Sequence, residues 1–414
     1  MKKSVIYILV FFGVLIISNR KSNAQNIGLL NDTIKNTVSL DFNYLHNSTA
    51  FTNEFIKTYY LGKYISQDIK DNVKRKLNDM NLFGQELNTS LYGIIHFDSV
   101  LHSPNHNLYI GVSSQSLLNL YFPNDLFKVV FYGNKEFLND TAYFNYLRST
   151  YYKYQSFDVG WLYQKNYKNL SLTSGIKISL LKGQQFYDVG MINGYLYTGN
   201  LGSSIDLGAK AVVLQSDTAN PAYSGTGSAI TFFTEIYVSE KSKIHIEFND
   251  LGFITWNKNT LAQSGDTSFN FTGADIVELI NGNSTSTSID SISSNFFEKS
   301  SKEKTTTVLP ARIFVYYQEK INEKWQYSLG LQQRLFFYYN MFFFGRVNYS
   351  FNKKITANIQ IAYGGYGNLA VGTGIRAKLG KSWQVIMQSN NIEGLILPKS
   401  FGGLSLQTGI IKQF

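Results

Sequence analysis

The chain has 414 residues, a formal net charge of +10 and no cysteine. Aromatic residues make up 15% of it and charged residues only 16%, which is too aromatic for a disordered chain and too poor in charge for an ordinary soluble enzyme of this size. Without cysteine, the chain has no disulfides, thiolate metal clusters, cysteine nucleophile or lipidated N-terminal cysteine.

The first 24 residues have the pattern of a secretory signal peptide. Lys2 and Lys3 precede an apolar run at 5–17, and small residues occupy positions 22 and 24, just before a predicted cleavage site at Gln25. The run is shorter than the ~20 apolar residues of a membrane-spanning helix. An uncleaved N-terminal anchor helix is the alternative. We expect export, with removal of 1–24 leaving 25–414 as the mature chain.

From about residue 36 to the end, apolar and polar residues alternate with period two, which is typical of strands with one apolar and one polar face. In one such segment Leu172, Ile176 and Ile178 alternate with Thr173 and Lys177. A soluble β-sandwich also shows this alternation. The choice between a sandwich and a membrane barrel therefore depends on other features.

Three features favour the barrel. The segments approach the ~9–11 residues that a tilted strand needs to cross a bilayer. Their polar faces carry charges and small polar side chains, which suit a wet lumen and would destabilise a dry sandwich core. Aromatic residues recur near the segment ends on the apolar face, as in the girdles of outer-membrane proteins: Trp161, Trp325, Tyr349, Tyr363 and Trp383. We therefore predict an all-β fold, an antiparallel transmembrane β-barrel in the outer membrane of a Gram-negative bacterium.

The number of strands is predicted to be about 14–16, since the segments 36–45 and 186–197 are the weakest candidates. Short lysine-bearing turns, such as those at 352–354 and 380–382, are expected on the periplasmic side. All of 25–414 is predicted to form one barrel.

Non-alternating stretches are expected on the opposite, extracellular side. The stretches 53–80 and 123–134 are predicted to be helical inserts. The segment 259–307, rich in Ser, Thr, Asn and Gly, is predicted to be the longest extracellular loop, with a short helix at 274–280.

The last strand ends at Phe414, after Leu404, Leu406 and Ile410. An apolar-alternating strand with a terminal aromatic residue resembles the signature that the bacterial barrel-assembly machinery reads. The predicted partners are therefore this machinery and outer-membrane lipid.

The sequence predicts no enzyme, no cofactor and no metal site. His102 and His106 stand four residues apart, but Pro104 between them forbids the helical turn that would aim both at one metal ion. The tripeptide 380–382 lacks the first glycine of a phosphate-binding loop, because position 375 is isoleucine. Basic residues are scattered rather than clustered with aromatic ones, which argues against nucleic acid as a partner.

The candidate functional residues are those predicted to line the lumen. They are four arginines of late segments and four acids of earlier ones: Arg312, Arg334, Arg346, Arg376, Asp158, Asp206, Glu235 and Glu247. One interpretation is that opposite charges pair across a solvated interior and stiffen the barrel. The alternative is an arginine ladder that selects an anionic solute.

Aromatic residues gather near the predicted outer mouth, at Phe336, Phe342 and Phe344. One interpretation is packing within the aromatic girdle. The alternative is a gate for an apolar ligand.

The segment 248–257 contains the pattern N-D-L-G-F-I-x-W, and a later strand opens with Leu309-Pro310. These motifs, together with the closing hairpin 389–414 and the 24–26 region, resemble a family of Bacteroidota outer-membrane barrels of unknown function. More distantly the chain looks like the PorP/SprF group, linked to type IX secretion and gliding, and like FadL-type transporters of hydrophobic compounds. The resemblance implies a barrel but carries no catalytic residues.

Two functions remain open from the sequence. The first is a porin-like passive pore or uptake barrel for the transport of small or hydrophobic solutes, supported by many small and polar lumen residues. The second is a non-catalytic scaffold or binding component of a Bacteroidota surface system, supported by the long loops. The insert 53–80 is either a plug inside the lumen or a helix on the surface.

Overall fold

The computed structural model describes residues 36–100, 103–166, 171–200, 204–271, 297 and 299–414. The predicted signal peptide 1–24 and the predicted helix 274–280 lie outside these residues. The described elements are, in chain order, β1 (Thr37–Ser48), α2 (Asn53–Tyr60), α3 (Gln67–Lys74), β2 (Met80–Val100), β3 (Ser103–Pro123), α4 (Asn124–Tyr132), η2 (Asn134–Phe137), β4 (Asp140–Tyr143), β5 (Leu147–Asn166), β6 (Ser171–Thr198), β7 (Ile205–Gln215), η4 (Pro221–Tyr223), β8 (Gly225–Tyr237), β9 (Ser242–Phe271), β10 (Lys299–Val308), β11 (Arg312–Lys320), β12 (Trp325–Arg334), β13 (Asn340–Ser350), β14 (Ile355–Gly365), β15 (Leu369–Leu379), β16 (Trp383–Ser389), α7 (Glu393–Ile396) and β17 (Leu404–Gln413).

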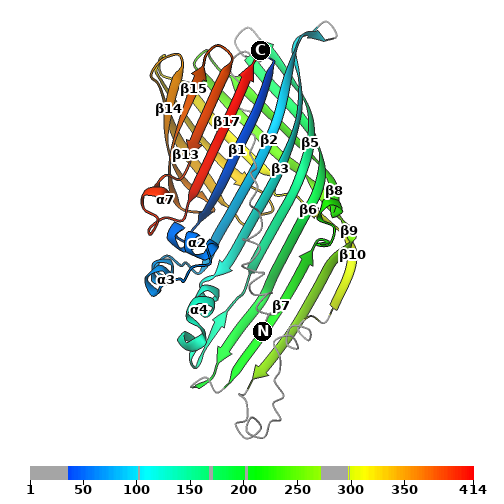
Figure 1. The fold of residues 1–414 in the computed structure, drawn as a ribbon, viewed down its shortest axis with the longest axis vertical. Helices are drawn as coiled ribbons and strands as arrows, with labels where there is room; N and C mark the ends of the chain where they lie inside the picture. The colour runs from blue at the N-terminus through cyan, green and yellow to red at the C-terminus, as the bar shows by residue number, and fades with distance from the viewer. Residues whose placement is uncertain (1–35, 101–102, 167–170, 201–203, 272–296, 298) are drawn as a thin grey trace.

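The described strands form one antiparallel sheet that closes into a barrel, because β1 pairs with both β2 and β17 (Figure 1). Three of the 17 strands are separate pieces of a wall strand: β4 continues as β5, β7 as β8 and β10 as β11, each pair lying along the same neighbouring strand. The closed ring therefore has 17 − 3 = 14 strands, which confirms the lower predicted number. We call the end with short turns and Phe414 the turn end, and the opposite end the loop end.

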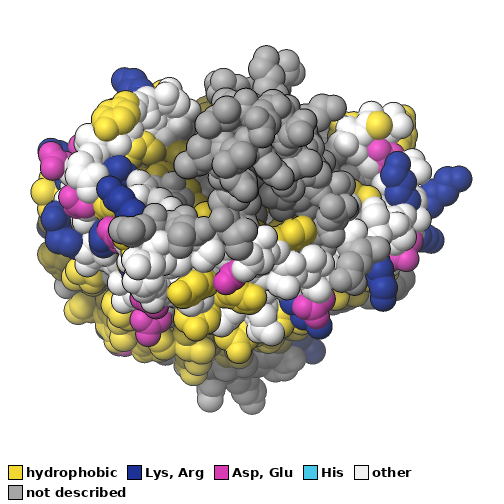
Figure 2. Space-filling model, turned by 90° about the horizontal axis from the view of Figure 1, so that it is seen from below, with side chains coloured by type: hydrophobic (Ala, Val, Ile, Leu, Met, Phe, Trp, Pro, Cys, Tyr) yellow, Lys and Arg dark blue, Asp and Glu magenta, His cyan; other side chains and the backbone are white. Residues whose placement is uncertain are grey.

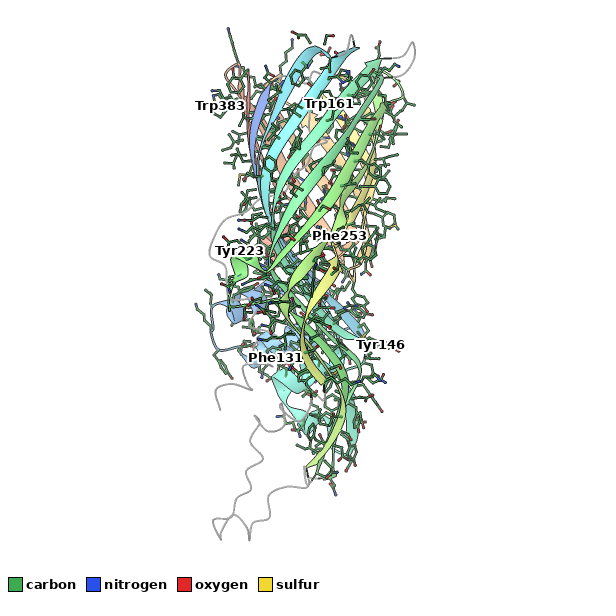
Figure 3. All side chains as sticks on the ribbon, turned by 90° about the vertical axis from the view of Figure 1, so that its right-hand side faces the viewer. Phe131, Tyr146, Trp161, Tyr223, Phe253 and Trp383 are labelled. Atoms are coloured by element: carbon green, nitrogen blue, oxygen red, sulfur yellow. The ribbon has the colours of Figure 1, made fainter. Side chains whose placement is uncertain are left out.

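Alternate side chains of the wall face outward and form an apolar belt. Its exposed members come from all around the ring: Leu40, Val112, Phe157, Ile178, Phe232, Phe253, Leu329, Val347, Ile359, Ile375 and Ile410. On β6 the outward positions change from Ile178 and Leu180 to Lys182, which marks the border of the belt toward the loop end. Trp161 and Trp383 lie near the turn end (Figure 3). A 14-strand antiparallel barrel with such a belt has the fold of an outer-membrane protein, as predicted.

Among the described residues, the structure contains no helix that is long and apolar enough to cross a membrane.

The wall has two unequal sides. On one side β2, β3, β5, β6 and β9 have 20 to 30 residues, and on the other side β11 to β17 have only 7 to 11. We call these the long wall and the short wall. Past the belt, β4, β6, β7, β9 and β10 continue as an open sheet, the extension, which gives the molecule its length (Figure 3).

The prediction of a loop over 259–307 was wrong at both ends. Strand β9 runs to Phe271, and β10 resumes at Lys299 and pairs with β9. A strand outside the membrane with both faces exposed to water needs no apolar face. Its Ser, Thr and Lys composition therefore looks like that of a loop.

The predicted helical inserts lie outside the barrel. Phe55 and Phe127 from α2 and α4 pack with Phe83, Leu118 and Tyr151 of the wall. On β2, β3 and β5 these three wall positions have the parity of the belt residues, so they are on the outer face. Of the two predicted positions for 53–80, the structure therefore has the one on the surface and not the plug in the lumen. Lys74 pairs with Glu136 rather than with an acid of the lumen.

Candidate functional site

The interior of the barrel is lined by polar, charged and aromatic side chains. Seven of the eight predicted lumen residues lie on inward-facing positions: Arg312, Arg334, Arg346, Arg376, Asp158, Glu235 and Glu247. Asp206 does not line the lumen, because β7 lies in the extension beyond the barrel. At the rim of the loop end, charged side chains of both signs are scattered (Figure 2).

The inward acids have partners on their own side of the barrel. Glu235 accepts a hydrogen bond from Lys243 at 2.9 Å, and His245 lies between the carboxylates of Glu235 (3.3 Å) and Glu247 (3.2 Å). Asp158 lies 3.9 Å from Lys177 on the neighbouring strand. Charges therefore pair within the interior, but chiefly with lysine and histidine.

Two of the four inward arginines, Arg346 and Arg334, have different partners. Arg346 donates to Gln360 at 2.7 and 3.1 Å. Arg334 pairs with Glu86, which sequence reasoning did not single out. The sequence did contain one signal for Glu86, namely its inward position on the polar face of β2.

The pair of Glu86 and Arg334 spans the lumen. Arg334 Nε donates to Glu86 Oε1 at 2.6 Å, its second nitrogen contacts Oε2, and Arg334 also donates to the carbonyl of Pro310 at 3.1 Å. Strands β2 and β12 are seven places apart in the ring of 14, so the two residues belong to opposite sides of the barrel. Both side chains are at least nine-tenths buried. The opposite walls must therefore lean together at the loop end, because two side chains cannot bridge an open lumen of this strand number.

The turn between β12 and β13, residues 335–339, makes a second crossing. Asn119 of β3 donates to the carbonyl of Tyr338 at 2.8 Å and accepts from its backbone N–H at 3.2 Å. The rings of Tyr338 and Tyr121 are stacked with centroids 4.0 Å apart, and Phe337 lies 6.1 Å from Tyr152. We call 335–339 the closing turn, because it carries the short wall across to the long wall.

Below the closing turn, the inner face of the long wall carries a buried aromatic cluster. Its main members are Tyr152, Tyr154, Phe186, Ile254, Trp256 and Leu309. We call these six residues the mouth core. Ile254, Trp256 and Leu309 are 0% exposed, so protein atoms cover these side chains completely inside the loop end.

The motif N-D-L-G-F-I-x-W contributes two residues, Ile254 and Trp256, to the mouth core. Asp250 adopts a positive φ of 58° in a bulge that moves Ile254 and Trp256 to the inner face. A Cβ at Gly252 would lie 2.2 Å from the carbonyl oxygen of Ser228, so only glycine fits there. Leu309 then donates its N–H to the carbonyl of Gly252 at 2.9 Å. The motif thus places Ile254 and Trp256 inside the barrel and provides the carbonyl to which Leu309 binds.

The three predicted mouth aromatics have different positions. Phe336 is 68% exposed, whereas Phe344 is buried on the inner side of the short wall and the half-buried Phe342 packs against it. The residues that close the mouth are the neighbours Phe337 and Tyr338, together with Asn119. Sequence alone could not separate these neighbours, because the turn breaks the period-two pattern.

One family model matches part of the chain. Residues 184–388, slightly less than half of the chain, match the model of a family of unknown function, DUF5723. The match includes the motif and Leu309-Pro310 but not the closing hairpin. No curated protein matches the chain.

Among solved structures, a mutant of the TodX monoaromatic hydrocarbon channel is 9% identical, covering 96% of this chain and 97% of that one, with a TM-score of 0.46. The Ralstonia pickettii toluene transporter TbuX is 10% identical, with coverage of 94% and 91% and a TM-score of 0.44. A Pseudomonas aeruginosa FadL homologue is 9% identical, with coverage of 92% and 90% and a TM-score of 0.39. These are distant likenesses of barrel architecture only.

Proposed function

We propose that this protein is an outer-membrane uptake barrel for small solutes, exported by its signal peptide and closed at rest at the loop end by the closing turn. Its loop end would face the outside of the cell and its short turns the periplasm, as in other bacterial barrels. The mouth core and the polar lumen below it would be the two successive environments that a solute meets.

The observation that supports a closable pore is the way the mouth is shut. A 14-strand ring encloses more space than the side chains of its own wall fill. A barrel that served only as a scaffold would not need a polar interior, because no solute would pass through it. Here the closure depends on few contacts, chiefly the pair of Glu86 and Arg334 and the contacts of Tyr338. Phe336, in the same turn, has a φ of 64°, a left-handed conformation that costs a bulky residue about 1–2 kcal/mol. Strain of this kind is concentrated at switching segments.

The test is conductance in planar bilayers and solute influx into liposomes, with purified mature protein. The double variant Phe337→Ala, Tyr338→Ala removes the rings of the closing turn, and we expect its conductance to rise several-fold above that of the wild type. The matched control is Phe351→Ala, which removes an exposed ring from a short turn at the opposite end and should leave conductance unchanged.

A silent double variant in a correctly assembled barrel would contradict the proposal. Correct assembly is checked by heat-modifiable mobility on gels. Absence of conductance together with co-purifying proteins would instead favour the scaffold function. No specific contact among the described residues supports that function.

A further inference from the structure

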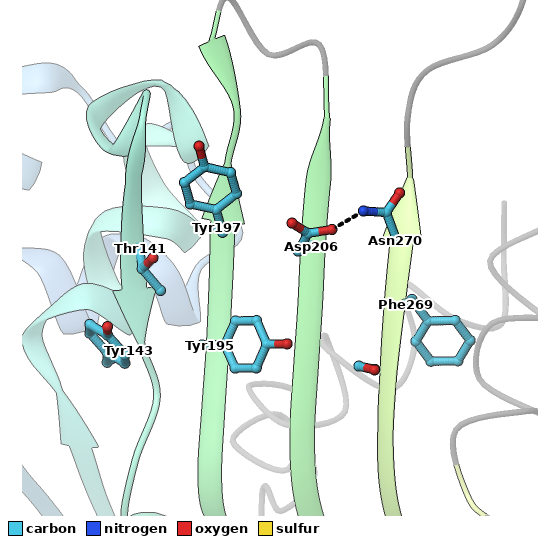
Figure 4. Close-up of a pocket in the computed structure, with 8 residues that line it drawn as sticks. Thr141, Tyr143, Tyr195, Tyr197, Asp206, Phe269 and Asn270 are labelled. Carbon is cyan, nitrogen blue, oxygen red and sulfur yellow. Dashed lines mark hydrogen bonds between the residues drawn. The ribbon is translucent and has the colours of Figure 1, made fainter.

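The extension carries a hollow that the closure of the mouth does not use. It has a volume of about 350 Å³ and is lined by Thr141, Tyr143, Tyr195, Tyr197, Asp206, Ser268, Phe269 and Asn270. Figure 4 shows these side chains across four adjacent strands, β4, β6, β7 and β9. We call this hollow the tyrosine groove.

The groove lies on the face of the extension that continues the inner wall of the barrel. Two bulges on β6, beside Lys153 and between Met191 and Asn193, each shift the side-chain alternation by one residue. Together they return Tyr195 and Tyr197 to the same face as inward Lys177. The other face is covered by helices, because Leu196 packs with the cluster around Phe137. The groove therefore overlooks the loop end.

Two of its tyrosine rings are exposed to solvent. Tyr143 is 54% exposed and Tyr195 is 38% exposed. The ring of Tyr195 lies across Gly208, since a Cβ there would come within 2.4 Å of the ring. A membrane girdle does not account for these tyrosines, because Tyr195 is 15 residues past Leu180, which is roughly 45–50 Å along the strand.

Polar groups stand beside the rings. Asp206 accepts a hydrogen bond from the amide of Asn270, and Ser268 and Thr141 add hydroxyl groups at the edge. Next along the same face, Lys210 and Asp266 pair at 2.9 Å and neutralise each other. The groove itself thus contains an acid and no cation, which disfavours anionic ligands. Its polar rim likewise disfavours a pure hydrocarbon.

We infer that the tyrosine groove binds a neutral carbohydrate. The C–H face of a sugar ring is apolar and stacks on an exposed tyrosine, whereas its vicinal hydroxyls need paired acceptors and donors, here the carboxylate of Asp206 and the amide of Asn270. An open groove that crosses four strands suits an extended oligosaccharide better than an enclosed small molecule. This site does not depend on transport through the barrel.

The experiment is calorimetric titration of detergent-solubilised full-length mature protein with a set of neutral hexasaccharides, the gluco-, manno- and xylo- series, and with hexagalacturonate as the charged comparison. We expect at least one neutral hexasaccharide to bind, and hexagalacturonate to bind at least about tenfold more weakly than it. Tyr195→Ala and Asp206→Ala should each weaken binding at least about tenfold, that is about 1.4 kcal/mol. Tyr223→Ala removes a tyrosine that is 79% exposed but outside the groove, and should have no effect.

Absence of binding by every neutral probe at millimolar concentration overturns the inference, as does binding that survives both groove variants. If Tyr195→Ala fails to assemble, Asp206→Ala decides, because it removes an exposed hydrogen bond and no packed ring. Conductance of the closing-turn variant is a separate readout, so the failure of one proposal is distinguishable from that of the other.

Discussion

The long wall and the short wall use the same strand chemistry for different purposes. Six of the seven strands β11 to β17 have 9 to 11 residues, the length that a tilted strand needs to cross a bilayer, and β16 has 7. Strand β9, with 30 residues, carries a belt segment, then two residues of the mouth core, then Ser268 and Asn270 of the tyrosine groove. The difference teaches that the mouth core and the tyrosine groove follow one another along the long wall, whereas the short wall contributes inward arginines and the closing turn.

Breaking the pair that joins the two walls should have the largest effect. Glu86→Ala leaves Arg334 buried without its carboxylate, which we expect to lower the free energy of unfolding by about 3–5 kcal/mol. Urea unfolding in lipid vesicles measures this loss. The double variant Glu86→Leu, Arg334→Met removes both charges and should recover most of the stability. A double variant as unstable as the single one would show that the charge pair is not the cause.

Placing a charge on the apolar belt should have the next largest effect. Ile359 of the short wall is 63% exposed at an outward position, and Ile359→Arg should cost about 2–4 kcal/mol if that surface faces lipid. Thr306→Arg is the matched control, because Thr306 is an exposed residue of β10 that hydrogen-bonds Thr255 beyond the belt. We expect this control to change stability by no more than about 0.5 kcal/mol. Equal losses in the same vesicle assay would place the border of the belt elsewhere.

The sequence predicted the short wall better than the long wall, for a physical reason. Period-two alternation arises where one face meets lipid and the other meets a polar lumen, as at Ile359 and Gln360. In the extension both faces meet water or helices, so β10 reads as a loop. The crossings could not be predicted, since Glu86 and Arg334 are 248 residues apart and nothing local encodes their meeting.

Hydrogen bonds across the lumen should differ in effect from those within the long wall. Asn119→Ala removes two hydrogen bonds to Tyr338, and we expect it to cost about 1–3 kcal/mol and to raise conductance. Tyr154→Phe removes one buried hydrogen bond, to Gln115 at 3.0 Å, between two strands of the long wall. It should cost about 1 kcal/mol and, because its aromatic ring stays in the mouth core, raise conductance much less than Asn119→Ala does. Equal conductance of the two variants would show that the closing turn does not control the passage of solutes.

The smallest expected effect concerns the strained residue of the closing turn. Phe336 has a φ of 64° while its side chain is 68% exposed, so its ring contributes little packing to offset the strain. Asparagine tolerates the left-handed conformation better, and Phe336→Asn should therefore raise the free energy of unfolding by up to about 1 kcal/mol. Because the stabilised conformation is the one in which Phe337 and Tyr338 reach the long wall, the same variant should also lower the frequency of channel opening. Bilayer recordings beside the thermal unfolding of the variant measure both quantities. A variant that is more stable but opens as often as the wild type would show that passage does not require this turn to move.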